Sequence, residues 1–273
     1  MESFRTLIGH GKNLTGTNGA RPLGEAMRLP PITRNGRFSR GETSTVTRLA
    51  GPSNHILSSL DPVLHKRLFR SLRPVDLKKD QFIFQQGQKH EFVYFPETAV
   101  ISKFHILEDG RTIEVEVTGN EGAVGVTSLF NSPTAINCAQ VCIQGTAYRV
   151  ESDIVLSEAQ SSSKLNELVC EQICRQLTNL SQKVICNTFH HVEQRLSTWL
   201  LMLDEKCDGD YLTMTQEHIA RVLGVHRPSV TYIAQEMRSK KLIDYVRGRI
   251  YIRDRKGLEK IACVCYSEMH SEM

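Results

Sequence analysis

The feature that most constrains the fold is a change in the spacing of apolar residues partway along the chain. Between Asp80 and Val150, apolar residues alternate with a period of two in short β-branched and aromatic runs that glycine-containing turns separate. From Leu165 onward the spacing becomes three to five residues, which is typical of helices. We therefore expect an α+β multidomain chain with an N-terminal β-roll or jelly-roll domain that senses a ligand or partner. The predicted strands cover residues 82–84, 92–95, 100–104, 112–117 and 139–150.

Two helices are expected to flank the strands in the sequence. Asp61 can cap a short helix that has Pro62 at its first position, which opens the folded part of the chain. A second helix, over residues 161–191, is about thirty residues long and is expected to need a partner for its apolar stripe. We therefore expect it to be a dimerisation helix in a homodimer, with the interface formed by Leu165, Leu168, Ile173, Leu177, Leu180 and Val184.

Charge is distributed unevenly along the 273 residues, whose net charge is +4. Residues 1–50 hold eight Lys/Arg and three Asp/Glu, residues 51–210 hold 15 and 20, and residues 211–260 hold 11 and five. A basic module beside an acidic body predicts a polyanion as partner, and nucleic acid is favoured over anionic lipid.

The N-terminal segment is polar, rich in glycine and without a sustained period. We expect residues 1–55 to form a disordered basic tail. Its Arg, Ser and Thr content leaves a mitochondrial transit peptide as an alternative, but it shows no clear amphipathic helical period. It also lacks the apolar stretch of a secretory signal, so a cytoplasmic location and reduced thiols are expected. No uncharged apolar run approaches the ~18–20 residues needed to cross a bilayer.

The motif that indicates function begins at Thr215, which can cap a helix that Gly224 ends. Pro228 then sits where a second helix begins, and Val225 fills the turn between the two helices. This pattern predicts a helix-turn-helix, whose second helix enters the major groove of DNA. A hairpin with Arg247-Gly248 at its turn follows and predicts a wing. The residues expected to face DNA are Thr215, Gln216, His226, Arg227, Pro228, Ser229, Thr231, Tyr232, Arg247 and Arg249.

With these motifs, the chain resembles the Crp/Fnr family of bacterial transcription regulators from about residue 60 to residue 261. The resemblance also rests on Gly87, on residues 94–96 (Tyr-Phe-Pro), on residues 109–115, on residues 122–125 (Gly-Ala-Val-Gly) and on residues 191–196. It implies a cyclic-nucleotide-binding-like β-roll over residues 56–160, the dimerisation helix, and a winged helix-turn-helix domain over residues 192–273. It further implies a homodimer that binds an inverted-repeat operator in double-stranded DNA, with RNA polymerase as a further partner.

The chain departs from the family members that bind cyclic AMP at two positions. Those members place a glutamate after the glycine that corresponds to Gly125 and an arginine before the next strand, where this chain has Val126 and Ile136. We therefore expect a regulator that does not depend on cyclic AMP. A ligand-independent regulator and a cysteine-based redox sensor remain alternatives, and an enzyme subunit is the least favoured. The effector pocket, if kept, is expected to involve Gly125, Val126, Ile136, Asn137, Leu180 and Ser181.

Eight cysteines are spread over the chain without a Cys-x-x-Cys motif. The pairs Cys138/Cys142 and Cys170/Cys174 could bind metal or report oxidation, but free cysteine is often a small buried apolar residue, and packing is favoured. His190 and His191 diverge by ~100° on a helix, so at most one would face a given ligand. We expect no metal, no cofactor and no catalytic residues, and therefore no enzyme.

Overall fold

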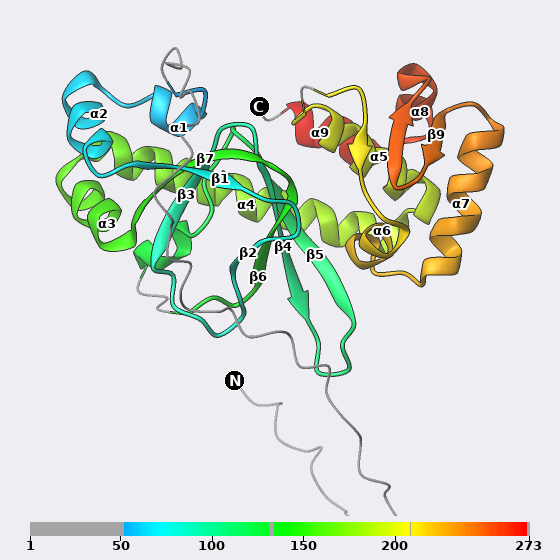
Figure 1. Cartoon of the computed structure of the whole chain (residues 1–273), viewed down its shortest axis with the longest axis horizontal. Helices are drawn as coiled ribbons and strands as arrows, with labels where there is room; N and C mark the ends of the chain where they lie inside the picture. The colour runs from blue at the N-terminus through cyan, green and yellow to red at the C-terminus, as the bar shows by residue number, and fades with distance from the viewer. Residues whose placement is uncertain (1–51, 131–133, 208, 272–273) are drawn as a thin grey trace, which may run out of the picture. The chain divides into compact units, whose positions relative to one another are not determined.

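The computed structural model describes residues 52–130, 134–207 and 209–271 of the chain (Figure 1). Most of the expected N-terminal tail lies outside the described residues. The boundary of that tail was placed too late, because Asn54 is fully buried and its amide donates to the carbonyl oxygens of Pro96 and Gly122 at 2.9 and 2.8 Å. Asn54 also caps helix α1 (His55–Ser58).

The expected β-roll is present and consists of two antiparallel sheets. One sheet has the strand order β1-β7-β3 and the other has the order β2-β6-β4-β5. Apolar side chains of both sheets, including Leu77, Ile101 and Val141, form a shared core. The strands are β1 (Arg73–Leu77), β2 (Phe82–Phe84), β3 (Phe92–Pro96), β4 (Val100–Ile106), β5 (Thr112–Thr118), β6 (Cys138–Ile143) and β7 (Gly145–Glu151).

Helical segments pack on the β1-β7-β3 sheet and form a second core with it. Helix α2 (Pro62–Phe69) begins as predicted, because the Asp61 carboxylate accepts from two backbone N–H groups of its first turn. Helix α3 (Ser152–Ser161) and the short 3-10 helix η1 (Val126–Phe130) were not predicted. Val93 and Phe95 of the sheet contact these helices, which bury the face of the sheet opposite the shared core.

The long helix α4 (Ser163–Phe189) is present, but only part of its apolar stripe is free. Leu165 is fully buried and Leu168 is 9% exposed, because both pack in the core with α1, α2 and α3. Their assignment to a dimer interface is therefore wrong. Leu177 and Val184 are 59% and 66% exposed and can meet a partner. Cys170 and Cys174 of the same helix are exposed in the single chain, so they are not packed within it.

The C-terminal part is a small helical domain with a three-stranded sheet. Its core is built around Leu196, Trp199, Leu212, Ile219 and Met237. Strand β8 was not predicted, because two residues are too few to show a period. The elements are α5 (Val192–Asp204), β8 (Leu212–Thr213), α6 (Gln216–Leu223), α7 (Arg227–Ser239), β9 (Ile243–Val246), β10 (Arg249–Ile252), α8 (Arg255–Ile261) and α9 (Val264–Ser271).

Among the described residues, no helix has both the length and the apolar character that crossing a membrane requires.

Candidate nucleic-acid interface

The first helix of the predicted pair, α6, has the ends that the sequence predicts. Thr215 caps it, since its hydroxyl accepts from the backbone N–H of His218 at 3.1 Å. Gly224 ends it in the left-handed conformation with φ at 62°, a conformation that glycine adopts without steric cost. The chain can then turn sharply into α7, as a helix-turn-helix requires.

The second helix, α7, packs one side against the core of the domain, and its N-terminal end is exposed on the other side. Its inner side chains Val230, Ala234 and Met237 are buried in the core of the domain. Arg227 and Pro228 are exposed in its first turn, and Tyr232 is 62% exposed one turn later. This exposed end has the orientation expected of a recognition helix.

A side-chain hydrogen bond joins the two helices of the motif near this exposed end, and a second one lies within α7. The Thr231 hydroxyl of α7 donates to the side-chain oxygen of Gln216 in α6 at 2.8 Å. The Tyr232 hydroxyl donates to Glu236 at 3.1 Å, which holds the ring along the outside of α7. The structure thus brings Gln216 and Thr231 together, next to Tyr232 in the sequence of α7.

The wing is formed by β9 and β10 around Arg247 and Gly248. These two residues have φ at 51° and 77°, the signs that a two-residue type I′ hairpin turn requires at both central positions. Arg247 is therefore held at the exposed tip. Arg249 is exposed on β10, with its guanidinium 4.7 Å from the centre of the Tyr211 ring.

A buried histidine lies in α6, next to Trp199 of α5. His218 is only 7% exposed, and Arg221 approaches its Nδ1 atom at 3.3 Å. Burial, with smaller contributions from the cations Arg221 and Lys79, lowers the pKa of His218 to about 4. Its ring is therefore neutral near pH 7, which suits packing against Trp199 at 6.2 Å between ring centres.

The residues predicted for an effector pocket differ from one another in how deeply they are buried. Gly125 is buried with φ at 98°, and a Cβ there would lie 2.6 Å from the carbonyl oxygen of Phe92, so only glycine fits. Val126 is 2% exposed, whereas Ile136 is 71% exposed. Asn137 instead contacts His105, with 3.2 Å between Oδ1 and Nδ1.

A pocket lined by described residues lies between β5, α4, α5 and α6. Its walls include Val117, Asn179, Met202 and Leu223. The six residues of the predicted effector pocket are not among those that line it. Sequence patterns gave no sign of this pocket, because its walls come from four separate elements.

One carboxylate in this pocket connects three elements. Glu114 of β5 is only 2% exposed. It accepts from the Ser102 hydroxyl of β4 at 2.6 Å, from the Lys183 ammonium of α4 at 2.9 Å and from the Trp199 indole N–H of α5 at 3.0 Å. The β-roll is therefore tied by hydrogen bonds to the long helix and to the first helix of the C-terminal domain.

Comparisons with known proteins agree with this architecture. A model of the cyclic nucleotide-binding domain matches residues 74–162, and a model of the Crp-like helix-turn-helix domain matches residues 194–261. The CRP-like cAMP-activated global transcriptional regulator of Mycobacterium tuberculosis is 21% identical over 214 residues, which cover 76% of this chain and 96% of that protein.

Two solved structures have the same fold. FixK2 from Bradyrhizobium japonicum superposes with a TM-score of 0.62 at 17% identity, covering 71% of this chain and 98% of that one. A transcriptional regulator of the Crp/Fnr family from Eubacterium rectale gives a TM-score of 0.63 at 17% identity, covering 77% and 98%.

A β-roll, a long helix and a winged helix-turn-helix define a class of DNA-binding regulators. The chain belongs to the Crp/Fnr family of transcription regulators. Members of this family are regulators and not enzymes.

Proposed function

We propose that the protein is a homodimer that recognises an inverted-repeat operator through α7 and does not depend on cyclic AMP. The observation that carries this proposal is that the N-terminal end of α7 and the arginines of the wing are both exposed in one helix-turn-helix domain. The proposal includes RNA polymerase as a further partner and a cytoplasmic location. It keeps the limits 161–191 and 192–273 and begins the β-roll domain no later than Asn54, which caps α1.

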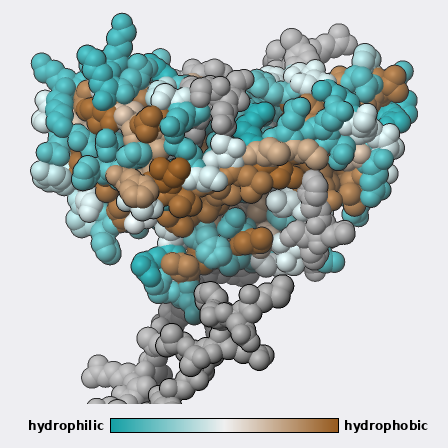
Figure 2. Space-filling model, turned by 180° about the vertical axis from the view of Figure 1, so that it is seen from behind, coloured by the Kyte–Doolittle hydropathy of each residue, from teal (hydrophilic) through white to brown (hydrophobic). Residues whose placement is uncertain are grey.

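An exposed apolar surface on α4 supports the homodimer. Leu177, Leu180 and Val184 remain from the predicted stripe, and Ile185 and Phe189 continue it with exposures of 43% and 75%. Figure 2 shows apolar side chains gathered in a band across this face of the molecule. Such a patch on a long helix typically marks a protein interface. A second copy of α4 is its natural partner, because a twofold axis pairs like surfaces.

Selection of bound DNA from a random pool tests this function. We expect an inverted repeat with half-site centres ~10 base pairs apart, because twofold-related recognition helices are separated by one helical turn of DNA. A single unrepeated site, or enrichment without any consensus, would contradict a dimeric sequence-specific reader.

Independence from cyclic AMP is supported by the residues at the two family positions. A buried phosphate requires a cation or several charge-assisted donors. Val126 is buried and apolar, and Ile136 points an apolar side chain to the surface. Neither can replace the glutamate or the arginine that the family resemblance predicts for nucleotide binding.

Isothermal titration calorimetry checks this second part of the proposal. We expect no saturable heat when cyclic AMP or cyclic GMP is titrated into the full chain, since neither Val126 nor Ile136 can compensate the phosphate charge. The same protein sample should bind its selected operator, which serves as the control for activity. Micromolar saturable binding of either nucleotide would disprove independence from cyclic nucleotides.

A further inference from the structure

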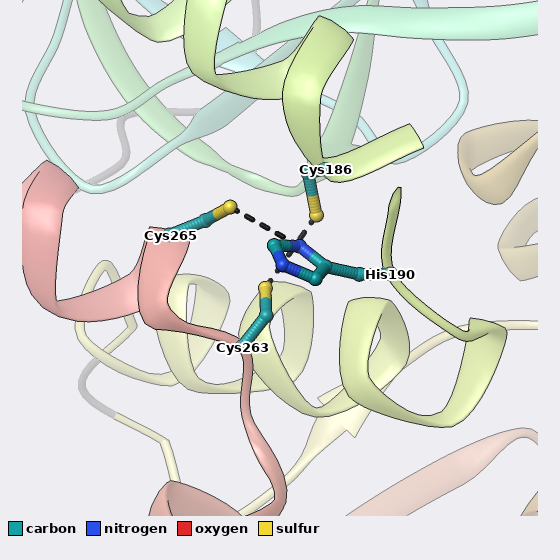
Figure 3. A group of neighbouring side chains, drawn as sticks. All are labelled: Cys186, His190, Cys263 and Cys265. Atoms are coloured by element: carbon teal, nitrogen blue, oxygen red, sulfur yellow. Dashed lines mark hydrogen bonds between the residues drawn. The ribbon is translucent and has the colours of Figure 1, made fainter. Parts of the chain in front are cut away.

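Three cysteines and one histidine from distant parts of the sequence meet near the end of α4. Cys186 lies in the last turn of α4, His190 follows that helix, Cys263 precedes α9 and Cys265 lies in the first turn of α9 (Figure 3). Their potential ligand atoms all lie within 4.8 Å of one another. The Cys186 and Cys263 sulfurs are 3.5 Å apart, and the Cys265 sulfur is 3.4 Å from His190 Nδ1.

This set of side chains has the composition and size of a zinc site. Three thiolates and one imidazole are a common ligand set for structural Zn²⁺, with Zn–S distances of ~2.3 Å in tetrahedral geometry. Ligand atoms of such a tetrahedron are ~3.5–3.8 Å apart. The two short distances in the cluster already fall near this range, and the longest needs a contraction of about 1 Å.

We propose that Cys186, His190, Cys263 and Cys265 bind one zinc ion. The site would be closed, since four protein ligands leave no coordination position for a substrate. It would therefore be structural and not catalytic. Cysteines elsewhere differ: Cys138 and Cys142 are buried in the β-roll, where burial raises the pKa of both thiols.

Groups around the cluster fit a bound metal. The Cys263 backbone N–H donates to the Thr198 hydroxyl oxygen at 3.2 Å, and that oxygen lies 3.1 Å from the Cys263 sulfur. Because the oxygen accepts from the backbone, its own hydrogen is free to donate to a thiolate. Such second-shell hydrogen bonds orient metal ligands and tune their basicity.

A nearby cation can offset the charge of the occupied site. Three thiolates with Zn²⁺ carry a net charge of −1, and the Arg195 guanidinium lies within electrostatic range of Cys186 and Cys263. The same guanidinium donates to the carbonyl oxygen of Leu223 at the end of α6. Arg195 therefore connects the cluster to the helix-turn-helix.

The position of the cluster indicates what the metal does. His190 and His191 form the joint between α4 and α5, and Cys263 and Cys265 hold the segment that follows α8. One ion would fix the orientation of α5 relative to α4, and it would link α9 to both helices. In a family whose long helix leads into the DNA-binding domain, this ion would stabilise the orientation of that domain.

Metal analysis of the full chain tests the proposal. Protein purified without chelator should contain about one zinc per chain by inductively coupled plasma mass spectrometry. Cys263→Ser should lower this content at least fivefold. The double variant Cys170→Ser/Cys174→Ser is the matched control and should keep the metal, because both cysteines are exposed on α4 and the nearer one, Cys174, lies ~18 Å along the helix from Cys186.

A second pair of variants separates metal binding from packing. His190→Cys should retain zinc because four thiolates are also a zinc ligand set, whereas His190→Ala should bind it much more weakly.

X-ray absorption at the zinc edge of the wild type should show three sulfur neighbours and one nitrogen neighbour, a result that does not depend on whether any variant folds. Wild-type chain that stays free of zinc after reduction and addition of Zn²⁺ would overturn the site. So would a Cys186–Cys263 disulfide in protein alkylated anaerobically, or unchanged zinc in Cys263→Ser.

Discussion

Replacement of Arg227 by alanine is expected to weaken operator binding by ~1–3 kcal/mol per half-site, which is the discrimination provided by one bidentate contact with guanine. Two half-sites give ~2–6 kcal/mol, or a loss of roughly 30-fold at the lower end. Arg227 is exposed at the first position of α7, and its guanidinium forms no ion pair with any described residue. By contrast, Arg238 and Lys240 at the other end of α7 pair with Asp244 and Glu193. Selection from a random DNA pool should show relaxed preference at one base position.

The wing arginines provide the matched control for this measurement. Arg247→Ala and Arg249→Ala should weaken binding to all sequences alike and lower the salt slope by about one, since phosphate contacts carry no base identity. If Arg227→Ala selects the same consensus with undiminished stringency, Arg227 does not read a base.

Leu177→Glu is expected to convert the proposed homodimer into monomers. Leu177 is 59% exposed and is the first residue of the free part of the α4 stripe, so a charge there leaves the fold of the single chain intact. In a twofold interface the substitution occurs twice, and each uncompensated buried carboxylate costs ~3–5 kcal/mol. At the lower end of this range, the two carboxylates together cost ~6 kcal/mol, which raises the Kd of the dimer by about four orders of magnitude. Sedimentation velocity should report 30.9 kDa instead of twice that mass.

Two further variants make this result interpretable. Leu177→Met keeps an apolar side chain of similar volume at the same position and should leave the dimer unchanged. Leu165→Glu should unfold the chain instead of dissociating it, because Leu165 is fully buried. If Leu177→Glu still sediments as a dimer, the interface lies on another surface.

Local signals explain why the helix-turn-helix could be predicted from sequence. Thr215, Gly224 and Pro228 determine where helices begin and end, and each acts on the backbone of residues next to it in the sequence. The hairpin at Gly248 was predictable for the same reason. The alternation of the β-roll likewise depends only on neighbours within each strand.

Features that depend on distant contacts were not predictable in this way. The sequence pattern places Leu165 and Leu177 in one apolar stripe of the same helix. Only the packing of α1, α2 and α3 shows that Leu165 belongs to the core and Leu177 to the surface. Strand β1 contains Pro74, which interrupts its pattern. Cys186 and Cys263 are 77 positions apart, and no spacing rule joins them.

The three donors that meet at Glu114 limit how this molecule can move. A buried carboxylate that loses one partner keeps its desolvation cost, so partial displacement of β4, α4 or α5 is unfavourable. Elements held in this way tend to exchange between discrete arrangements and not to slide continuously. A signal that reaches the long helix should therefore be transmitted as a threshold response, with few molecules in intermediate conformations.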